Sequence, residues 1–268
     1  MIYALIAIVL LFVLYLLALS GRTGHRGLRK LRGWGYAHRG LHGNGVPENS
    51  MLAFRKALEG GYGIEFDVHL MKDGTLAIIH DSSLKRAASA DVLIEDLTTA
   101  DLANYRLEGT DEKIPLFSEL LDLYAGKAPL IIELKAHGNH AELSKAVCDA
   151  MEGYKGVYCM ESFDPRVVQW LRKNRPEIIR GQLAENFLKV KQNPLNIVLK
   201  FIMTNHLLNF LSMPDFVAYK FADRNTLGTR ICRKFWKLQG VSWTIRSQED
   251  YDTAVKEGWI PIFEYFTP

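Results

Sequence analysis

Short apolar runs alternate with amphipathic runs along most of this chain of 268 residues. Apolar positions that recur every three or four residues predict helices, whereas short runs of β-branched and aromatic residues between turn signals predict strands. The pattern predicts helices at 50–59, 118–124, 141–151, 165–174, 226–238 and 248–257. It predicts strands at 35–38, 63–68, 76–80, 130–135, 157–163, 178–183, 216–221, 241–245 and 260–265.

Strands and helices alternate from residue 34 to residue 268, and this alternation favours a parallel sheet covered by helices. About eight strand–helix units in a region of this length fit a closed barrel better than an open sheet, so we predict an α/β fold of the TIM (β/α)8 type. Residues 84–115 interrupt the rhythm with one short helical pattern at 97–105, which predicts a small insertion after strand 2. The sequence shows no internal repeat and no second domain.

Residues 2–19 form an apolar run without a charged side chain, about the minimum length for a transmembrane helix. Basic residues follow this run, whereas a secretory signal peptide carries them ahead of its apolar run. We therefore predict a transmembrane anchor at 1–21, a basic linker at 22–33 and a barrel domain at 34–268; removal by a signal peptidase at Ala18-Leu19-Ser20 is the alternative. The positive-inside rule places the barrel on the cytoplasmic side of the cell membrane, because basic residues follow the single-pass run: Arg22, Arg26, Arg29, Lys30 and Arg32.

Composition and charge narrow the classes of function. The formal net charge is only +3, and the local excess of basic residues is confined to 22–32. A nucleic-acid binder carries a stronger and more clustered excess, so we expect no nucleic-acid partner. The three cysteines, Cys148, Cys159 and Cys232, match neither a zinc site nor a CxxC motif, and we interpret them as buried thiols.

Three carboxylates lie where two of the predicted strands end. Glu65 and Asp67 are two positions apart, so both point to one side of their strand, and in a barrel that side is the interior near the catalytic mouth. This pair alone also suits a solvated strand end. Glu133, however, lies inside a strongly apolar strand, where an unpaired carboxylate is rare. Three carboxylates make an oxygen-rich site that suits Mg²⁺ or Ca²⁺, with Mn²⁺ as a further candidate.

Two histidines also end predicted strands, and each is followed by a charged residue. Either His38 or His80 alone suits a structural hydrogen bond, but together they suit an acid and a base, because imidazole titrates near neutral pH. Arg39 and Lys135 supply positive charge for a phosphate group. Cleavage of a phosphodiester requires this combination of a cation, a base for the nucleophile and an acid for the leaving alkoxide.

With these residues in place, the sequence resembles the glycerophosphodiester phosphodiesterase family, which has a TIM-barrel fold. The resemblance covers roughly residues 34–266, and the order and spacing of the motifs match as well as their identity. The sequence departs from the family at Met71, where the family usually has Thr. The motifs that carry the resemblance are His38-Arg39-Gly40, Pro47-Glu48-Asn49-Ser50, Glu65-x-Asp67-Val68, Lys72-Asp73-Gly74, His80-Asp81, Ile114-Pro115, Glu133-Leu134-Lys135, Ser162-Phe163-Asp164 and Trp243-Thr244.

The resemblance implies metal-dependent hydrolysis of glycerophosphodiesters to an alcohol and glycerol 3-phosphate. It also implies roles for eight residues. His38 and His80 would form the acid–base pair, although the sequence does not say which is the acid. Trp243 would line the pocket, with ordinary barrel packing as the alternative, and the extra histidines His42 and His69 are interpreted as incidental. The metal would bind Glu65, Asp67 and Glu133, and the phosphate would contact Arg39 and Lys135.

Two other functions remain open at this level. One is a lysophospholipase D that acts on membrane lysophospholipids, because residues 186–211 mix apolar side chains with lysines and could lie on lipid. A long barrel helix plus a loop, with one buried face, is the alternative for the same residues. The other function is a non-catalytic binding protein tethered to the membrane, and the retention of the histidines, carboxylates and Lys135 argues against it.

Overall fold

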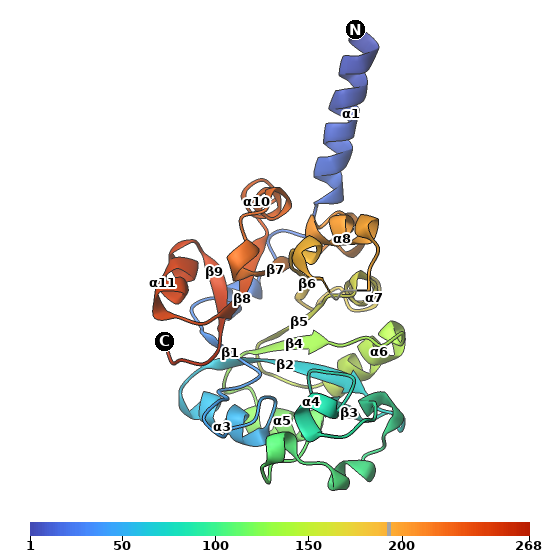
Figure 1. The fold of residues 1–268 in the computed structure, drawn as a ribbon. Helices are drawn as coiled ribbons and strands as arrows, with labels where there is room; N and C mark the ends of the chain where they lie inside the picture. Colours follow the sequence, from blue (N-terminus) through green and yellow to red (C-terminus); the bar gives the residue numbers. More distant parts are fainter. Residues whose placement is uncertain (192–193) are drawn as a thin grey trace.

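Eight parallel strands close into a barrel in the computed structural model, which describes residues 1–191 and 194–268 (Figure 1). Each strand pairs with the next one around the barrel, and β1 pairs with both β2 and β9, which closes it. The prediction of a TIM barrel is confirmed. The barrel strands are β1 (Tyr36–His38), β2 (Gly63–Leu70), β4 (Leu130–Leu134), β5 (Tyr158–Ser162), β6 (Arg180–Ala184), β7 (Phe216–Lys220), β8 (Gln239–Ile245) and β9 (Trp259–Phe263).

Helices cover the outside of the barrel, and several begin at a side chain that accepts a backbone hydrogen bond, such as Ser50 and Asp164. One predicted helix, at 226–238, is shorter than expected. It ends at Lys234 because the chain turns at Lys237, whose φ of +58° is left-handed, and this turn buries Leu238. The helices are α3 (Met51–Glu59), α5 (Phe117–Tyr124), α6 (His140–Ala150), α7 (Pro165–Asn174), α8 (Ile197–Thr204), α9 (Asn209–Ser212), α10 (Leu227–Lys234) and α11 (Gln248–Lys256).

The predicted insertion follows β2 and contains its own small core. Strand β3 (Leu76–Ile78) turns back antiparallel to β2, and a short helix α4 (Lys85–Ala88) follows it. The expected helix at 97–105 is wrong: the chain forms only a 3-10 turn at Asp101–Asn104. Asp101 ends the preceding extended segment by accepting hydrogen bonds from the amide and hydroxyl of Thr98, and the chain is extended again at Tyr105.

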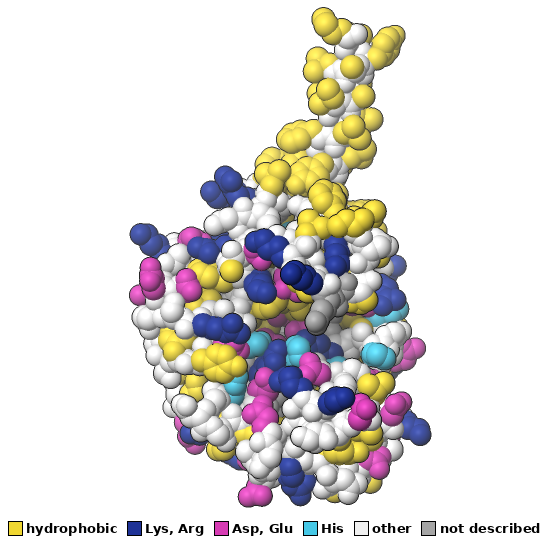
Figure 2. Space-filling view, viewed as in Figure 1, with side chains coloured by type: hydrophobic (Ala, Val, Ile, Leu, Met, Phe, Trp, Pro, Cys, Tyr) yellow, Lys and Arg dark blue, Asp and Glu magenta, His cyan; other side chains and the backbone are white. Residues whose placement is uncertain are grey.

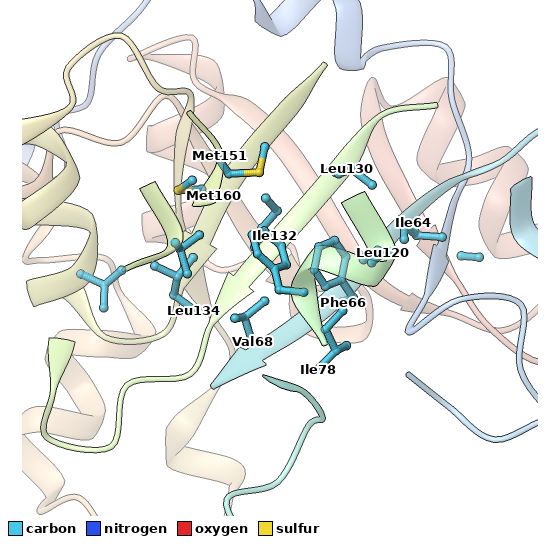
Figure 3. Close-up of a cluster of buried hydrophobic side chains, with 14 of the residues drawn as sticks. Ile64, Phe66, Val68, Ile78, Leu120, Leu130, Ile132, Leu134, Met151 and Met160 are labelled. Atoms are coloured by element: carbon cyan, nitrogen blue, oxygen red, sulfur yellow. The ribbon is translucent and has the colours of Figure 1, made fainter. Parts of the chain in front are cut away.

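Alternation along β2 explains how the barrel separates its core from its site. Ile64, Phe66 and Val68 point outward and pack with β4 and the helix layer, as Figure 3 shows. The residues between them, Glu65 and Asp67, therefore point inward. Burial of such an aromatic or aliphatic side chain contributes about 1.5–3 kcal/mol each, which is why the strand tolerates two carboxylates on its other face.

The amino-terminal segment closes the floor of the barrel, at the end opposite the catalytic mouth. Arg22 forms an ion pair of 2.5 Å with the buried Asp215, which precedes β7. Leu28 and Leu31, in the short helix α2 (Leu28–Leu31), fill the interior beside the first residues of several strands. The hydroxyl of Tyr36 donates to the carbonyl of Leu31 at 2.9 Å. The segment is therefore held to the barrel at Arg22, Leu28 and Leu31, while basic side chains between them, such as Arg26 and Lys30, are exposed.

Helix α1 (Ile2–Ala18) projects from the barrel, and its apolar side chains are largely exposed (Figures 1 and 2). It contains 17 residues. Among the helices of the described residues, none is both long and apolar enough to cross a membrane. The structure thus gives no support to the transmembrane span predicted at residues 2–19.

Candidate active site

A hollow opens at the carboxyl ends of the barrel strands. Figure 2 shows histidine, acidic and basic side chains gathered in the hollowed centre of this face. A second, more open hollow adjoins it and is lined in part by Asp81 and Lys135. Active sites of TIM barrels lie at this end. The residues that line the first hollow are His38, Arg39, Glu65, His80, Glu133, Glu161, Phe163, Leu183, Trp243 and Ile262.

Three buried carboxylates meet at this mouth, as the strand pattern predicts. Asp67 on β2 stands in register with Glu133 on β4, and carboxylate oxygens of Glu65, Asp67 and Glu133 all lie within 4.8 Å of one another. Burial and the charge of Asp67 raise the pKa of Glu65 well above its usual value. Burial opposes ionisation of Asp67 as well, but Lys135, His80 and Arg39 hold its pKa well below the usual range.

Lys135 supplies positive charge to this cluster. Its Nζ lies 2.9 Å from Asp67 Oδ1 and 2.7 Å from Glu133 Oε1. A fourth buried carboxylate, Glu161, stands opposite Glu133 on β5, and burial raises its pKa well above the usual value. Oxygen Oε2 of Glu161 has no hydrogen-bond partner among the described residues. This surplus of buried oxygen ligands fits a divalent cation, because crowded carboxylates are costly without one.

Glu161 was missed in the sequence. Its signal is weaker than that of Glu133, because the strand around Glu161 begins with Tyr158 and ends with Ser162, whereas Glu133 lies among leucines and isoleucines. The strand pairing places the two side chains next to each other on the inner face.

His38 is held by a carboxylate from the far end of the chain. Its Nδ1 lies 2.5 Å from Oε2 of Glu264, and its Nε2 lies 3.8 Å from Oε2 of Glu65. Burial lowers the pKa of His38, although the hydrogen bond with Glu264 counteracts it. Arg246 in turn donates to Glu264 from Nε at 2.6 Å. Glu264 was also missed in the sequence, where it is a single acidic residue within the predicted strand at 260–265; in the structure it directly follows β9.

His80 has a carboxylate partner of its own. Its Nδ1 lies 2.6 Å from Asp81 Oδ1, and the imidazole is 31% exposed at the rim of the hollow. Arg86 donates to Asp81 at 2.5 Å and to Glu48 at 2.6 Å, and Glu48 also accepts from Arg39 at 2.9 Å. A chain of charged hydrogen bonds therefore connects the surroundings of the two histidines.

The insertion positions His80 through a histidine that the sequence interpretation treated as incidental. His69 Nδ1 lies 2.7 Å from Glu95 Oε1, and His69 Nε2 lies 3.2 Å from the carbonyl oxygen of His80. This buried side chain, on β2, connects Glu95 of the insertion to the backbone of His80, a structural contact that the sequence does not predict. The other extra histidine, His42, has its Nε2 3.6 Å from Oε2 of Glu264.

The loop after β1 places Arg39 over the carboxylates. Arg39 has a left-handed φ of +54°, which turns the chain, and its Nε lies 3.4 Å from Asp67 Oδ2. Asn49 donates to the same oxygen of Asp67 at 2.8 Å, and Ser50 accepts a hydrogen bond from the amide of Ala53 at the start of α3. The motif at residues 47–50 thus both begins a helix and orients an acidic residue of the site.

Trp243 forms an aromatic wall of the hollow. Its ring stands edge to face with Phe163 at a centroid distance of 5.6 Å. The indole Nε1 is buried and has no hydrogen-bond partner among the described residues. A buried donor of this kind usually has a partner, so its position beside the hollow suits contact with a bound molecule.

All eight residues singled out in the sequence lie around the two adjoining hollows or contact their walls. His38, Arg39, Glu65, His80, Glu133 and Trp243 line the first hollow, Lys135 lines the second, and Asp67 contacts Lys135 directly. Their catalytic and binding roles remain predictions.

A TIM barrel whose mouth combines two carboxylate-bound histidines, clustered carboxylates and cationic side chains defines the class of hydrolases that act on phosphate diesters. A family model described as the glycerophosphoryl diester phosphodiesterase family matches residues 38–264. The chain belongs to this family of phosphoric diester hydrolases, as the sequence predicts.

Some relatives of this chain are named as glycerophosphodiester phosphodiesterases and others as lysophospholipases D. A glycerophosphodiester phosphodiesterase of Caldanaerobacter subterraneus is 28% identical over 239 residues, which cover 83% of this chain and 89% of that protein. A lysophospholipase D of Homo sapiens is 33% identical over 131 residues, which cover 44% of this chain and 40% of that protein. For the human protein and another relative that is 40% identical, the chain spans less than half of the relative's length.

A solved structure supports the fold. A phosphodiesterase of Oleispira antarctica, in complex with the product sn-glycerol-3-phosphate, superposes with a TM-score of 0.72 at 20% identity, covering 91% of this chain and 95% of that one.

Proposed function

We propose that this protein hydrolyses glycerophosphodiesters to an alcohol and glycerol 3-phosphate. The observation that carries the proposal is the pair of histidines, each bonded to its own carboxylate, on either side of a cluster of buried carboxylates. A histidine bonded in this way is held in one orientation and can transfer a proton from its free nitrogen. The names of the full-length relative and the sn-glycerol-3-phosphate bound to the Oleispira protein support this choice of substrate.

In the proposed reaction, Arg39 and Lys135 bind the phosphate while the two histidines transfer protons. The lowered pKa of His38 suits a proton acceptor, which leaves His80 to protonate the departing alcohol. The nucleophile is the 2-hydroxyl of the substrate's glycerol, followed by opening of a cyclic phosphate, or it is water directly. A divalent cation, Mg²⁺ or Ca²⁺ with Mn²⁺ as a further candidate, would be held by Glu65, Asp67 and Glu133 and would stabilise the charge on the phosphate oxygens.

The test is a panel of glycerophosphocholine, glycerophosphoethanolamine and lysophosphatidylcholine, assayed after EDTA and again with each cation restored. We expect release of glycerol 3-phosphate from the soluble diesters, loss of activity with EDTA, and recovery with one of the cations. His80→Ala should lower the rate about 10²–10⁴-fold. Activity that survives complete chelation would refute the carboxylate metal site, and an unchanged rate in the variant would refute acid–base catalysis by His80.

A second candidate function is lysophospholipase D activity on membrane lysophospholipids. Two observations favour it. Helix α8, which comes after β6 in the chain, exposes apolar residues that could contact lipid. A segment of this chain also matches the human lysophospholipase D. Hydrolysis of lysophosphatidylcholine without any activity on glycerophosphocholine would make this the primary function.

We also propose that α1 holds the protein at a membrane, with the barrel on the cytoplasmic side. At about 1.5 Å per residue, a helix of this length spans most of a hydrocarbon core of about 30 Å, and none of its residues is buried by the barrel. Carbonate extraction of membranes tests the attachment, and protease digestion of sealed vesicles of known orientation tests the side. Release of the protein by carbonate would refute the membrane attachment. A barrel that is protected from protease in inside-out vesicles would refute its cytoplasmic orientation.

A further inference from the structure

Exposed apolar side chains surround the base of α1, on the segment that connects β6 to β7 and at the end of α10. The alternative of a long helix plus a loop at 186–211 is wrong in its helix, because the described residues form a 3-10 turn at Phe187–Lys189 and the short helices α8 and α9. Residues 192 and 193 lie outside the described residues. We call this surface the collar. It consists of Ile197, Val198 and Phe201 on α8, Phe210 and Leu211 on α9, and Phe235 after α10.

Helix α8 is unusual because four of its apolar residues, Ile197, Val198, Leu199 and Phe201, are exposed. Ile197 is 68% exposed and Phe201 is 52% exposed, and Thr204 is the only buried residue of the helix. A surface helix of a soluble domain normally presents such residues to the core. A contiguous apolar surface of this kind marks a site of contact with a partner or a membrane.

The collar is continuous with α1. Helix α1 contacts α9, and the indole Nε1 of Trp236 donates to the carbonyl of Leu16 at 2.9 Å. Phe235 stands edge to face with Trp236 at a centroid distance of 5.2 Å. Figure 2 shows the apolar side chains of α1 continuing onto the barrel below it. A membrane that surrounds α1 would therefore also contact the collar.

The charge around the collar identifies the kind of surface that it faces. Residues 186–237 contain nine basic and only two acidic side chains. Three of the nine basic residues are already in ion pairs, Lys189 with Asp223, Lys220 with Glu185 and Arg224 with Glu257. The salt bridges among the described residues involve neither Lys200 on α8 nor Arg230 and Lys234 on α10. Basic residues beside exposed apolar ones suit an anionic bilayer, where each adds about 1 kcal/mol of attraction.

We propose that the collar docks on the headgroup region of an anionic bilayer and so fixes how the catalytic mouth is turned toward the lipid. The proposal rests on the membrane attachment of α1 and extends it from one helix to a defined face of the barrel. Strand β6 ends at the mouth, and α8 is the next α-helix of the described residues after it. A lysophospholipid could therefore pass its headgroup into the hollow while its acyl chain stays at the membrane.

The test uses nitroxide labels on the full chain in vesicles of phosphatidylcholine with one third phosphatidylglycerol. The three native cysteines are buried, so labels report the introduced positions. Phe201→Cys probes the collar, and Val255→Cys on α11, which is 53% exposed, is the matched control. Val9→Cys probes α1. We expect labels at 201 and 9 to be accessible to oxygen and shielded from a water-soluble nickel complex, and the label at 255 to show the opposite.

Each other outcome has a definite meaning. A label at 9 in lipid with a label at 201 in water would overturn the collar proposal and leave the attachment of α1 intact. Labels at both positions in water would overturn both. Dipolar broadening between labels at 201 would identify a second copy of the chain as the occupant of the collar, which also overturns the proposal.

An activity measurement separates the collar from the chemistry. In Ile197→Ser/Phe201→Ser, kcat/KM for lysophosphatidylcholine in these vesicles should fall about tenfold or more, because two apolar side chains no longer enter the interface. Activity on soluble glycerophosphocholine should stay unchanged, and Val255→Ser should behave like the natural protein. An equal loss on both substrates would contradict a docking role. If the natural protein hydrolyses neither substrate, the proposed function fails, while the label result still decides the collar.

Discussion

Substitution of Glu264 by Gln tests how His38 is positioned. The change keeps the size of the side chain but removes the negative charge whose oxygen lies 2.5 Å from Nδ1 of His38. With about 4 Å between the charge centres, a pair of this kind is worth about 4 kcal/mol at an effective dielectric constant of 20. Arg246 shares the carboxylate, so about half of this stabilisation of the imidazolium remains available to His38.

Loss of that stabilisation lowers the pKa of His38 further, because the hydrogen bond and the charge of Glu264 both favour the protonated ring. It also frees the ring to adopt the other tautomer, so kcat should fall about 10²–10⁴-fold. The sign of the pH effect is fixed, because removal of a negative charge always disfavours the protonated imidazole. The limb of the pH–kcat profile that belongs to His38 should therefore move to lower pH. Movement of the acidic limb would identify His38 as the base, and movement of the basic limb would identify it as the acid.

The assay is a pH profile of glycerol 3-phosphate release under saturating substrate, with Arg246→Gln as the matched control. Arg246 contacts the other oxygen of Glu264, and its side chain is 64% exposed. Its removal leaves the full carboxylate to His38, so the same limb should move slightly to higher pH with little loss of kcat. A Glu264→Gln enzyme that keeps kcat within about threefold, or whose limb moves upward, would refute the reasoning.

Three further predictions concern metal binding and stability. Glu133→Gln should weaken binding of the activating cation by at least about 100-fold in calorimetric titration, and unchanged affinity would contradict the metal assignment. Although burial opposes it, hydrogen bonds from His69 and Ser82 lower the pKa of Glu95 from 4.5 to about 2. The stability from this carboxylate is thus fully present above pH 4.5 and is lost as the pH falls toward 2, so urea unfolding should show a loss of about 2–3 kcal/mol that Glu95→Gln does not show. Phe66→Ala should lower the free energy of unfolding by about 3–5 kcal/mol, because it leaves a cavity in the core. A loss below about 1 kcal/mol would contradict this prediction, since neighbouring side chains would then have closed the cavity.

The barrel could be predicted because its signals are local. Period-two patterns such as Ile64, Phe66 and Val68 mark the outward faces of strands, and capping residues such as Ser50 and Asp164 mark helix starts. The inward direction of Glu65 and Asp67 follows from the same alternation. Much of the candidate site could therefore be assembled from two strands and the loops beside them.

The parts that were missed depend on contacts between distant residues. Glu264 reaches His38 across 226 positions, and no local pattern distinguishes it from an ordinary charged residue at a strand end. The same holds for His69, whose importance lies in its bonds to Glu95 and to the His80 backbone. The 97–105 segment has a helical pattern, but the side chain of Asp101 binds the backbone of Thr98 and limits it to one turn.

The packed amino-terminal segment has a mechanical consequence. Because Arg22, Leu28 and Leu31 are fixed in the floor of the barrel, the joint between α1 and the barrel is stiff, unlike a flexible tether. With a flexible tether, the length of the linker would set how often the catalytic mouth meets its substrate. With a stiff joint, the tilt of the barrel sets how often the catalytic mouth meets its substrate. A pull on α1 is carried by the floor of the barrel, at the end away from the histidines and carboxylates, so their geometry is shielded from forces on the helix.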